Sequence, residues 1–140
     1  MSTDTRIRWG WIKGMYIYTI IVSGLLGLGI ILIPETIKST LPWPVEEPIA
    51  FGILGSIYLA FGLLSILGLR SPLKFVPVLL LQLCYKSIWF IGVVLPLWIT
   101  ARFPSYAVPT VIILAIFIIG DLIAIPFSYL FARQDAASRV

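Results

Sequence analysis

The sequence predicts an all-α integral membrane protein, an antiparallel four-helix bundle formed by a single transmembrane domain over residues 1–140. Two observations lead to this fold class. Of the 140 residues, 60% are hydrophobic and only 11% are charged, whereas a soluble domain usually carries about 25% charged residues. Apolar runs long enough to cross a bilayer recur along the chain, and in lipid a helix satisfies its own backbone hydrogen bonds. The predicted spans are residues 15–33, 49–69, 75–99 and 107–131.

The first predicted span, residues 15–33, follows the basic residues Arg6, Arg8 and Lys13. This order is also typical of a signal peptide. The apolar core is longer than that of a signal peptide, however, and no small-residue cleavage site precedes Pro34. We therefore expect this segment to be a retained helix.

Prolines separate the spans. Those at the predicted boundaries are Pro34, Pro48, Pro72, Pro104 and Pro109. Pro96 and Pro126 fall inside the third and fourth spans, where the missing N–H predicts a kink. Glu46 and Glu47 are expected to stabilise the start of the second helix, since carboxylates are favourable there. A cluster that collects cations together with Glu35 is the alternative.

The distribution of basic residues predicts that both termini are cytoplasmic, because cytoplasmic loops carry an excess of Lys and Arg. This orientation places seven basic residues inside: Arg6, Arg8, Lys13, Arg70, Lys74, Arg133 and Arg139. Only Lys38 and Arg102 lie outside. Aromatic residues at the boundaries agree, with Trp9, Trp11 and Tyr129 inside and Trp43, Trp98 and Tyr106 outside. The longest loop, residues 34–48, then faces outward.

Composition excludes several classes of site. The chain has no histidine and a single cysteine, Cys84. This excludes an intrachain disulfide, a Cys-x-x-Cys redox pair, a His-based catalytic triad and a His/Cys metal cluster. The net charge of +4 lies beside the apolar segments, without interleaved stacking aromatics. We therefore predict no cofactor, no metal and no nucleic-acid partner.

Two charged residues lie inside the predicted spans. Lys86, in "LQLCYKSIWF", is near the middle of the third span, and Asp121, in "IIGDLIAIPF", is near the middle of the fourth. At about 1.5 Å per residue, both lie roughly 20 Å from the outer ends of their helices. Each costs about 2.5–3.5 kcal/mol at a helix centre. Because a short loop joins these antiparallel helices, we expect Lys86 and Asp121 to meet as an intramembrane ion pair.

Neighbouring side chains extend this pair into a predicted binding site. Gln82, Lys86 and Trp89 share one helix face, and Trp89 is expected to lie over the ammonium as a cation–π partner. Phe117, Asp121 and Ser128 share a face of the fourth span. The predicted site residues are Lys86, Asp121, Gln82, Tyr85, Trp89, Tyr58 and Ser128, with Ser65 as a further candidate.

Three interpretations of the pair stay open. It is a strut that fixes helix pairing, a site for a polar or ionisable headgroup, or part of a proton or ion pathway. A buried ion pair need not stabilise a fold more than apolar residues would, which favours a role beyond stability.

Small residues gather in the first two spans. They are Ser23, Gly24, Gly27, Gly29, Gly52, Gly55, Ser56, Gly62, Ser65 and Gly68. Small residues let membrane helices approach closely. Packing inside the helix bundle is the simpler interpretation, and contact with another subunit or partner is the alternative.

The stretches "LQLCYKSIWF" and "GDLIAIPFSYLF", within this layout of four spans, resemble small four-helix bacterial membrane proteins of the DoxX-like type. The resemblance implies the fold and a bacterial inner (plasma) membrane, and some members of these families are accessory subunits of membrane oxidoreductases. Vitamin-K-reductase-like enzymes need a Cys-x-x-Cys, and small multidrug exporters centre on a glutamate in the first span. Neither feature is present here.

The sequence therefore favours a non-enzymatic multi-pass membrane protein. It is expected to be an accessory or assembly subunit, or a binder of a lipophilic small molecule, organised around Lys86 and Asp121. One alternative is a small, oligomeric, proton-coupled or ion transporter. Another is an intramembrane enzyme acting on a lipid or quinone, with Lys86 or Asp121 as acid or base. The expected partners are the bilayer, a larger membrane complex or a second copy of the chain, and a lipophilic ligand.

Overall fold

Four helices of the computed structural model are long and apolar enough to cross a membrane, which confirms the predicted number of spans. The structure describes residues 6–41 and 47–133. The four helices are Trp9–Leu32, Pro48–Arg70, Val76–Ile99 and Ser105–Ala124, and they contain 20 to 24 residues each. Trp43, Glu46 and Arg139, to which the sequence assigned roles, lie outside the described residues.

The first span consists of α1 (Trp9–Thr19), a π-helical turn η1 (Ile20–Gly24) and α2 (Leu25–Leu32). It begins six residues before the predicted boundary because the helix extends through the exposed Trp9 and Trp11. A short helix, α3 (Pro34–Thr40), follows where the sequence predicted only a loop. Glu35 in its first turn pairs with Lys38, with 3.3 Å between Oε1 and Nζ.

The second span, α4 (Pro48–Arg70), starts with the side-chain cap that the sequence predicted for Glu47. Its carboxylate accepts hydrogen bonds from Ile49 N at 3.1 Å and from Ala50 N at 2.6 Å. These two N–H groups have no partner within the helix. Glu47 therefore stabilises the first turn of α4 as an N-cap, which fixes where the helix begins.

The third span consists of α5 (Val76–Trp89), a second π-helical turn η2 (Phe90–Val94) and α6 (Leu95–Ile99). Pro96 lies in the first turn of α6. Pro96 lacks an N–H to donate, and the hydrogen-bond pattern changes from π-helical to α-helical just before it. The helix nevertheless continues through this proline to the end of the span.

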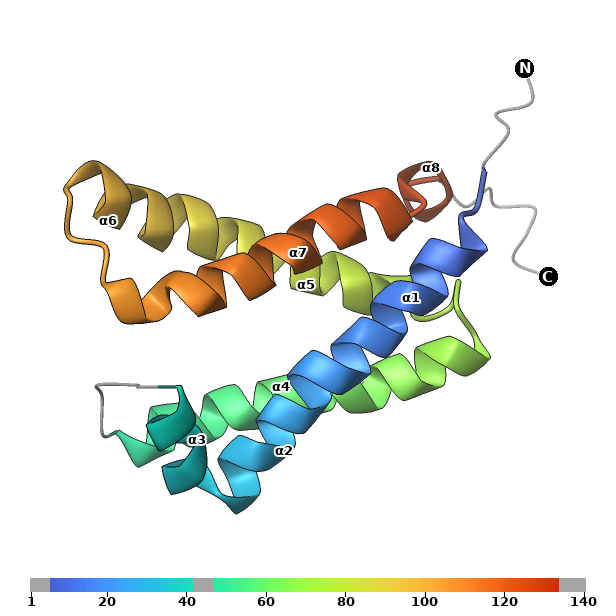
Figure 1. The fold of residues 1–140 in the computed structure, drawn as a ribbon. Coiled ribbons are helices and arrows are strands. Elements are labelled where there is room, and N and C mark those ends of the chain that lie inside the picture. Colours follow the sequence, from blue (N-terminus) through green and yellow to red (C-terminus); the bar gives the residue numbers. More distant parts are fainter. Residues whose placement is uncertain (1–5, 42–46, 134–140) are drawn as a thin grey trace.

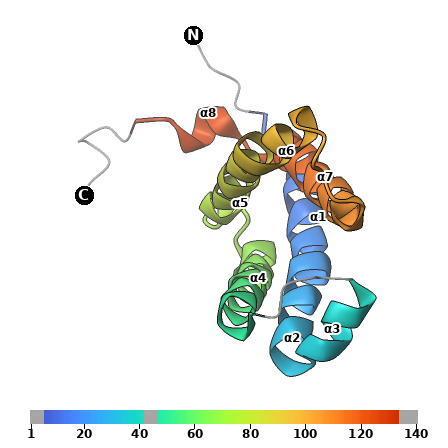
Figure 2. The ribbon, with the colours of Figure 1, turned by 90° about the vertical axis from the view of Figure 1, so that its left-hand side faces the viewer.

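The fourth span ends seven residues before the predicted boundary at Phe131. After the 3₁₀ turn η3 (Ser105–Ala107), α7 (Val108–Ala124) is followed by a break and by α8 (Phe127–Leu130). Ile125 is extended, with φ −70° and ψ 122°, because the residue before a proline is sterically disfavoured in the helical region. The kink expected at Pro126 is therefore a full break, and α8 turns away from the other helices (Figure 2).

The spans pair as two helical hairpins. In the first hairpin, α1, η1 and α2 pack along α4; in the second, α5 packs along α7. The hairpins meet through α1, which contacts both α7 and α5, and through α4 and α5. From there they separate toward the end that carries α3 and α6 (Figure 1).

Glycines hold the first hairpin together at very short range. A Cβ at Gly27 would lie 2.6 Å from the carbonyl oxygen of Gly55, and a Cβ at Gly24 would lie 3.4 Å from the Cα of Gly62. These glycines therefore let the first two spans approach each other closely. Gly52, in contrast, faces open space, and Ser56 is exposed.

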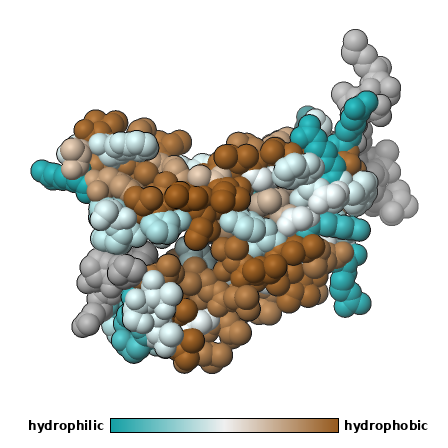
Figure 3. Space-filling view, in the orientation of Figure 1, coloured by the Kyte–Doolittle hydropathy of each residue, from teal (hydrophilic) through white to brown (hydrophobic). Residues whose placement is uncertain are grey.

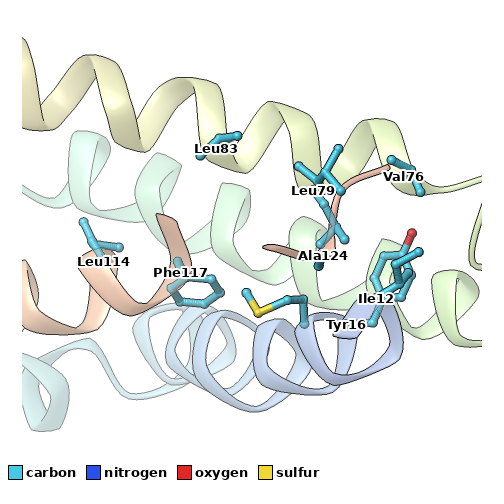
Figure 4. Packing of buried hydrophobic residues seen from close by; sticks show 10 residues of the cluster. Ile12, Tyr16, Val76, Leu79, Leu83, Leu114, Phe117 and Ala124 are labelled. Carbon is cyan, nitrogen blue, oxygen red and sulfur yellow. The ribbon is translucent and has the colours of Figure 1, made fainter. Parts of the chain in front are cut away.

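The hydrophobic core lies where the hairpins meet. Leu79 of α5 and Ala124 of α7 face each other there, close to Ile12 and Tyr16 of α1 (Figure 4). Much of the remaining apolar surface is exposed, as expected for helices that face lipid. Hydrophilic residues gather at the end of the molecule near α8 and the start of α1, and brown, hydrophobic atoms cover much of the middle (Figure 3).

Candidate functional site

Lys86 is completely buried at 0% exposure, in the middle of the third span. Its Nζ donates a hydrogen bond of 2.7 Å to Oε1 of Gln82, one turn earlier on α5. The same nitrogen lies 3.7 Å from the centre of the Phe117 ring on α7 and 5.0 Å from that of Tyr85. An amide oxygen and the faces of two aromatic rings therefore surround the ammonium.

A relay of hydrogen bonds connects Lys86 to the first span. The other end of the Gln82 amide donates to Oγ1 of Thr19 on α1 at 3.1 Å. Thr19 in turn donates to the backbone carbonyl of Met15 at 2.8 Å. Gln82 and Thr19 are both fully buried. The relay therefore links the two hairpins at the level of Lys86, and it satisfies buried polar groups that would otherwise be costly in this apolar setting.

Asp121 lies one turn beyond Phe117 on α7 and is also completely buried. Within the described part of the chain, neither of its carboxylate oxygens has a hydrogen-bond partner. The carboxylate interacts electrostatically with Lys86, Tyr16 and Tyr85. Both predicted charges thus lie in the interior, but a buried carboxylate without hydrogen bonds is rare in folded proteins.

The predicted direct ion pair between Lys86 and Asp121 is not formed. Among the described residues, the salt bridge present is that between Lys38 and Glu35. Lysine side chains in helices point back toward the N-terminus, which brings the ammonium to Gln82. On the α7 side, Phe117 occupies the position over the ammonium. The two charges are therefore neighbours that interact through space.

Two further buried polar groups lack partners in the described structure, the hydroxyl of Tyr85 on α5 and that of Ser65 on α4. The ring of Tyr85 stacks on Phe61, with 5.6 Å between the ring centres. Tyr58, also predicted for the site, is partly buried and lies one turn before Phe61 on α4. It interacts electrostatically with Tyr85. Polar groups from α4, α5 and α7 thus continue from Asp121 toward Tyr58.

Two predicted site residues lie elsewhere. Trp89 is not the cation–π partner of Lys86, because the lysine side chain points away from it; its ring instead meets Phe90 edge-on at 5.5 Å. Ser128 is exposed on α8, beyond the break at Pro126, and therefore does not share a face with Asp121.

Thr19 was not among the site residues predicted from the sequence. The signal that could have found it is the spacing of Tyr16, Thr19 and Ser23, which places three polar residues on one face of an apolar span. All three are buried. A polar stripe inside a membrane helix faces protein rather than lipid.

Comparisons with known proteins add no family: no family model, curated protein or solved structure matches this chain. In the ranges that the structure describes, no group of three His, Cys, Asp or Glu side chains could hold a metal ion. The buried polar side chains are therefore the basis of the functional argument.

Proposed function

We propose that the protein is a multi-pass protein of a bacterial inner membrane that binds a lipophilic molecule with a polar head beside Asp121, Lys86 and Tyr85. The observation that carries this proposal is the Asp121 carboxylate, completely buried and without a hydrogen bond to either oxygen in the described structure. Burying such a group without a donor costs several kcal/mol in real proteins. A ligand that donates a hydrogen bond would remove much of that cost.

The surrounding groups define the chemistry of the ligand head. Asp121 accepts hydrogen bonds, whereas Lys86 has donors beyond the one given to Gln82. The Tyr85 hydroxyl can donate or accept. A head that both donates and accepts, such as a hydroxyl or amide group, fits this set, and the apolar surroundings fit a hydrocarbon body.

Access between the two hairpins supports a lipophilic ligand. A cavity of about 60 Å³ lies mainly within the first hairpin, where Leu26, Leu54 and Tyr58 line it, and Thr110 is its lining residue from the second hairpin. This volume has room for a few water molecules, and a lipophilic ligand is larger. A ligand would therefore enter by moving the hairpins apart, passing Tyr58 before it reaches Tyr85.

Mass spectrometry of the purified protein tests this proposal. The protein would be isolated in mild detergent as wild type, Asp121→Asn and Asp121→Leu with Lys86→Met, and bound lipophilic compounds would be extracted and identified. Cys84→Ser is the matched control, because Cys84 is exposed on the same helix as Lys86. We expect a compound that wild type and the control retain and that both site variants lose. A wild type without such a compound, or folded variants that keep it, would overturn the proposal.

A proton-coupled transporter is the second candidate. It is supported by two ionisable side chains that are buried near each other without a direct bond, so that either can exchange its partner. In liposomes it predicts a pH-dependent proton flux that vanishes in Asp121→Asn. An accessory subunit, the role implied by the DoxX-like resemblance, predicts no flux and co-purification with a larger complex.

The proposed orientation places both termini in the cytoplasm. In a Cys84→Ser background, Ser71→Cys and Ser105→Cys would report the two sides, since both serines are exposed at helix ends. We expect a membrane-impermeant maleimide to label position 105 in intact cells and position 71 only after permeabilisation. The reverse pattern would contradict the orientation.

A further inference from the structure

Two hollows adjoin at the end of the molecule where the chain begins. The first, of about 260 Å³, is lined by Arg6, Arg8 and residues 122–128 at the break between α7 and α8. The second, of about 710 Å³, lies between α1 and α7. Ile123 lines both, so the two hollows are neighbours along α7.

The first hollow suits an anion. Arg8 donates a hydrogen bond of 3.3 Å to the carbonyl of Ile123, which the break at Pro126 leaves without its usual helical partner. This contact holds the guanidinium at the hollow. Among the described residues, no acidic side chain lines it and neither arginine forms an ion pair with a carboxylate. Two arginines in an open hollow at a membrane boundary can bind a phosphate group with several donors each.

The second hollow suits an acyl chain. Gly10 and Gly14 form its floor on α1, and an added Cβ at either position would meet nothing within 4 Å. Tyr18, Ile116 and Ile119 lie farther along the groove. From Gly10 to Tyr18 the groove follows roughly 12 Å of helix at about 1.5 Å per residue. This length is close to the roughly 15 Å depth of one leaflet, half of the hydrocarbon core.

We propose that the two hollows together form one binding site for an anionic phospholipid of the leaflet that faces the N-terminus. The phosphate headgroup binds to Arg6 and Arg8, and one acyl chain lies in the groove between α1 and α7. The charge of the first hollow and the apolar groove beside it, which shares Ile123, favour this ligand over a bare anion or a protein helix. The site is separate from Asp121 and does not depend on the ligand proposed there.

Native mass spectrometry in mild detergent tests the site by titration with phosphatidylglycerol and phosphatidylcholine of identical acyl chains. At about 1 kcal/mol per arginine, we expect phosphatidylglycerol to bind roughly ten- to thirtyfold more tightly. Arg6→Gln with Arg8→Gln should abolish the preference. Lys13→Gln, which changes an exposed basic residue that lines neither hollow, should keep it. Arg6→Gln alone, which leaves the Arg8 hydrogen bond to Ile123 in place, should reduce the preference.

Gly14→Leu tests the groove, because a Cβ at this position meets nothing within 4 Å, so the larger side chain is expected to occupy the groove without disturbing the fold. We expect this change to weaken the binding of both lipids. Equal binding of the two lipids by wild type, or an unchanged preference in the double arginine variant, would overturn the proposal. Two other outcomes would also overturn it. Displacement of phosphatidylglycerol by millimolar inorganic phosphate would indicate a site for a free anion, and a dimer that Gly14→Leu abolishes while lipid binding persists would assign the groove to a second copy of the chain.

Discussion

The ammonium nitrogen of Lys86 lies 3.7 Å from the centre of the Phe117 ring, which stands one helical turn before Asp121 on α7. An aromatic face and the Gln82 amide therefore hold the cation, while the carboxylate keeps both oxygens without a hydrogen bond in the described structure. Among the described residues, Lys86 thus has partners for its charge without contacting a carboxylate, whereas the carboxylate of Asp121 has no hydrogen-bond donor. The missing donor is the basis for proposing a ligand at Asp121.

The Lys86–Phe117 contact predicts a measurable coupling. In a double-mutant cycle of Lys86→Met and Phe117→Leu, the free energies of unfolding should be non-additive by about 1–2 kcal/mol, since a desolvated cation–π contact is worth about 2 kcal/mol. Unfolding by SDS in mixed micelles, followed by circular dichroism, provides the measurement. Trp89→Leu in place of Phe117→Leu is the control and should be additive with Lys86→Met. Additivity in both cycles would show that the ring does not hold the cation.

The hydrogen bond between Gln82 and Thr19 predicts a loss of stability in Thr19→Val. The change keeps the shape but removes the oxygen that accepts from Gln82 across the hairpins. We expect a loss of about 0.6–1.7 kcal/mol in the free energy of unfolding. Thr100→Val is the matched control, because Thr100 is exposed and its described side-chain hydrogen bonds go to carbonyls of its own span, at 2.9 and 3.3 Å. Equal effects of the two changes would argue against the relay.

The glycine contact in the first hairpin predicts that Gly27→Ala is strongly destabilising. A Cβ there would press on the backbone of α4, which cannot move aside as a side chain can. The hairpin would have to separate, with a loss of about 1–3 kcal/mol, as for overpacked cores. Gly52→Ala, which enters open space on α4, should be neutral or stabilising by up to about 1 kcal/mol. Thermal unfolding in detergent would separate the two, and a stable Gly27→Ala would refute this packing.

The hydroxyl of Tyr16 predicts a link between the first span and the turn before the third. It donates to the carbonyl of Pro72 at 2.7 Å. Tyr16→Phe should therefore lower the free energy of unfolding by about 0.5–1.5 kcal/mol. Tyr18→Phe, two residues away and without a described hydroxyl hydrogen bond, should change it little. If Tyr18→Phe proved the more harmful change, the role assigned to Tyr16 would be wrong.

Hydropathy and charge placement predicted the four helices and the burial of Lys86 and Asp121, because lipid imposes strong constraints on length and polarity. The Glu47 cap followed from local chemistry. The contact partners of Lys86 did not follow. Whether the ammonium contacts Phe117, Trp89 or Asp121 depends on the direction of the lysine side chain and on the rotation of α7 about its axis. The spacing of polar residues along one span does not determine either of them.

The end of the fourth span illustrates a second limit. Hydrophobicity continues through Phe131, so composition alone extends the helix past Pro126. The constraint that proline places on Ile125 was stronger than the apolar pattern. The site residue Ser128 was misplaced for the same reason. The helix α3 was missed because its seven residues are too short to show a clear periodicity.

The π-helical turn η1 divides the first span into two halves with different neighbours. Before it, α1 contacts α4 of its own hairpin as well as α5 and α7 of the other, whereas beyond it α2 packs on α4. If the same residues formed an uninterrupted α-helix, every side chain beyond the turn would be rotated by about 100° around the helix axis relative to Thr19. Gly27 would then no longer face Gly55 of α4. The extra residue in the π-helical turn therefore sets the rotation of α2 relative to α1, so that one continuous span packs on different neighbours along its length.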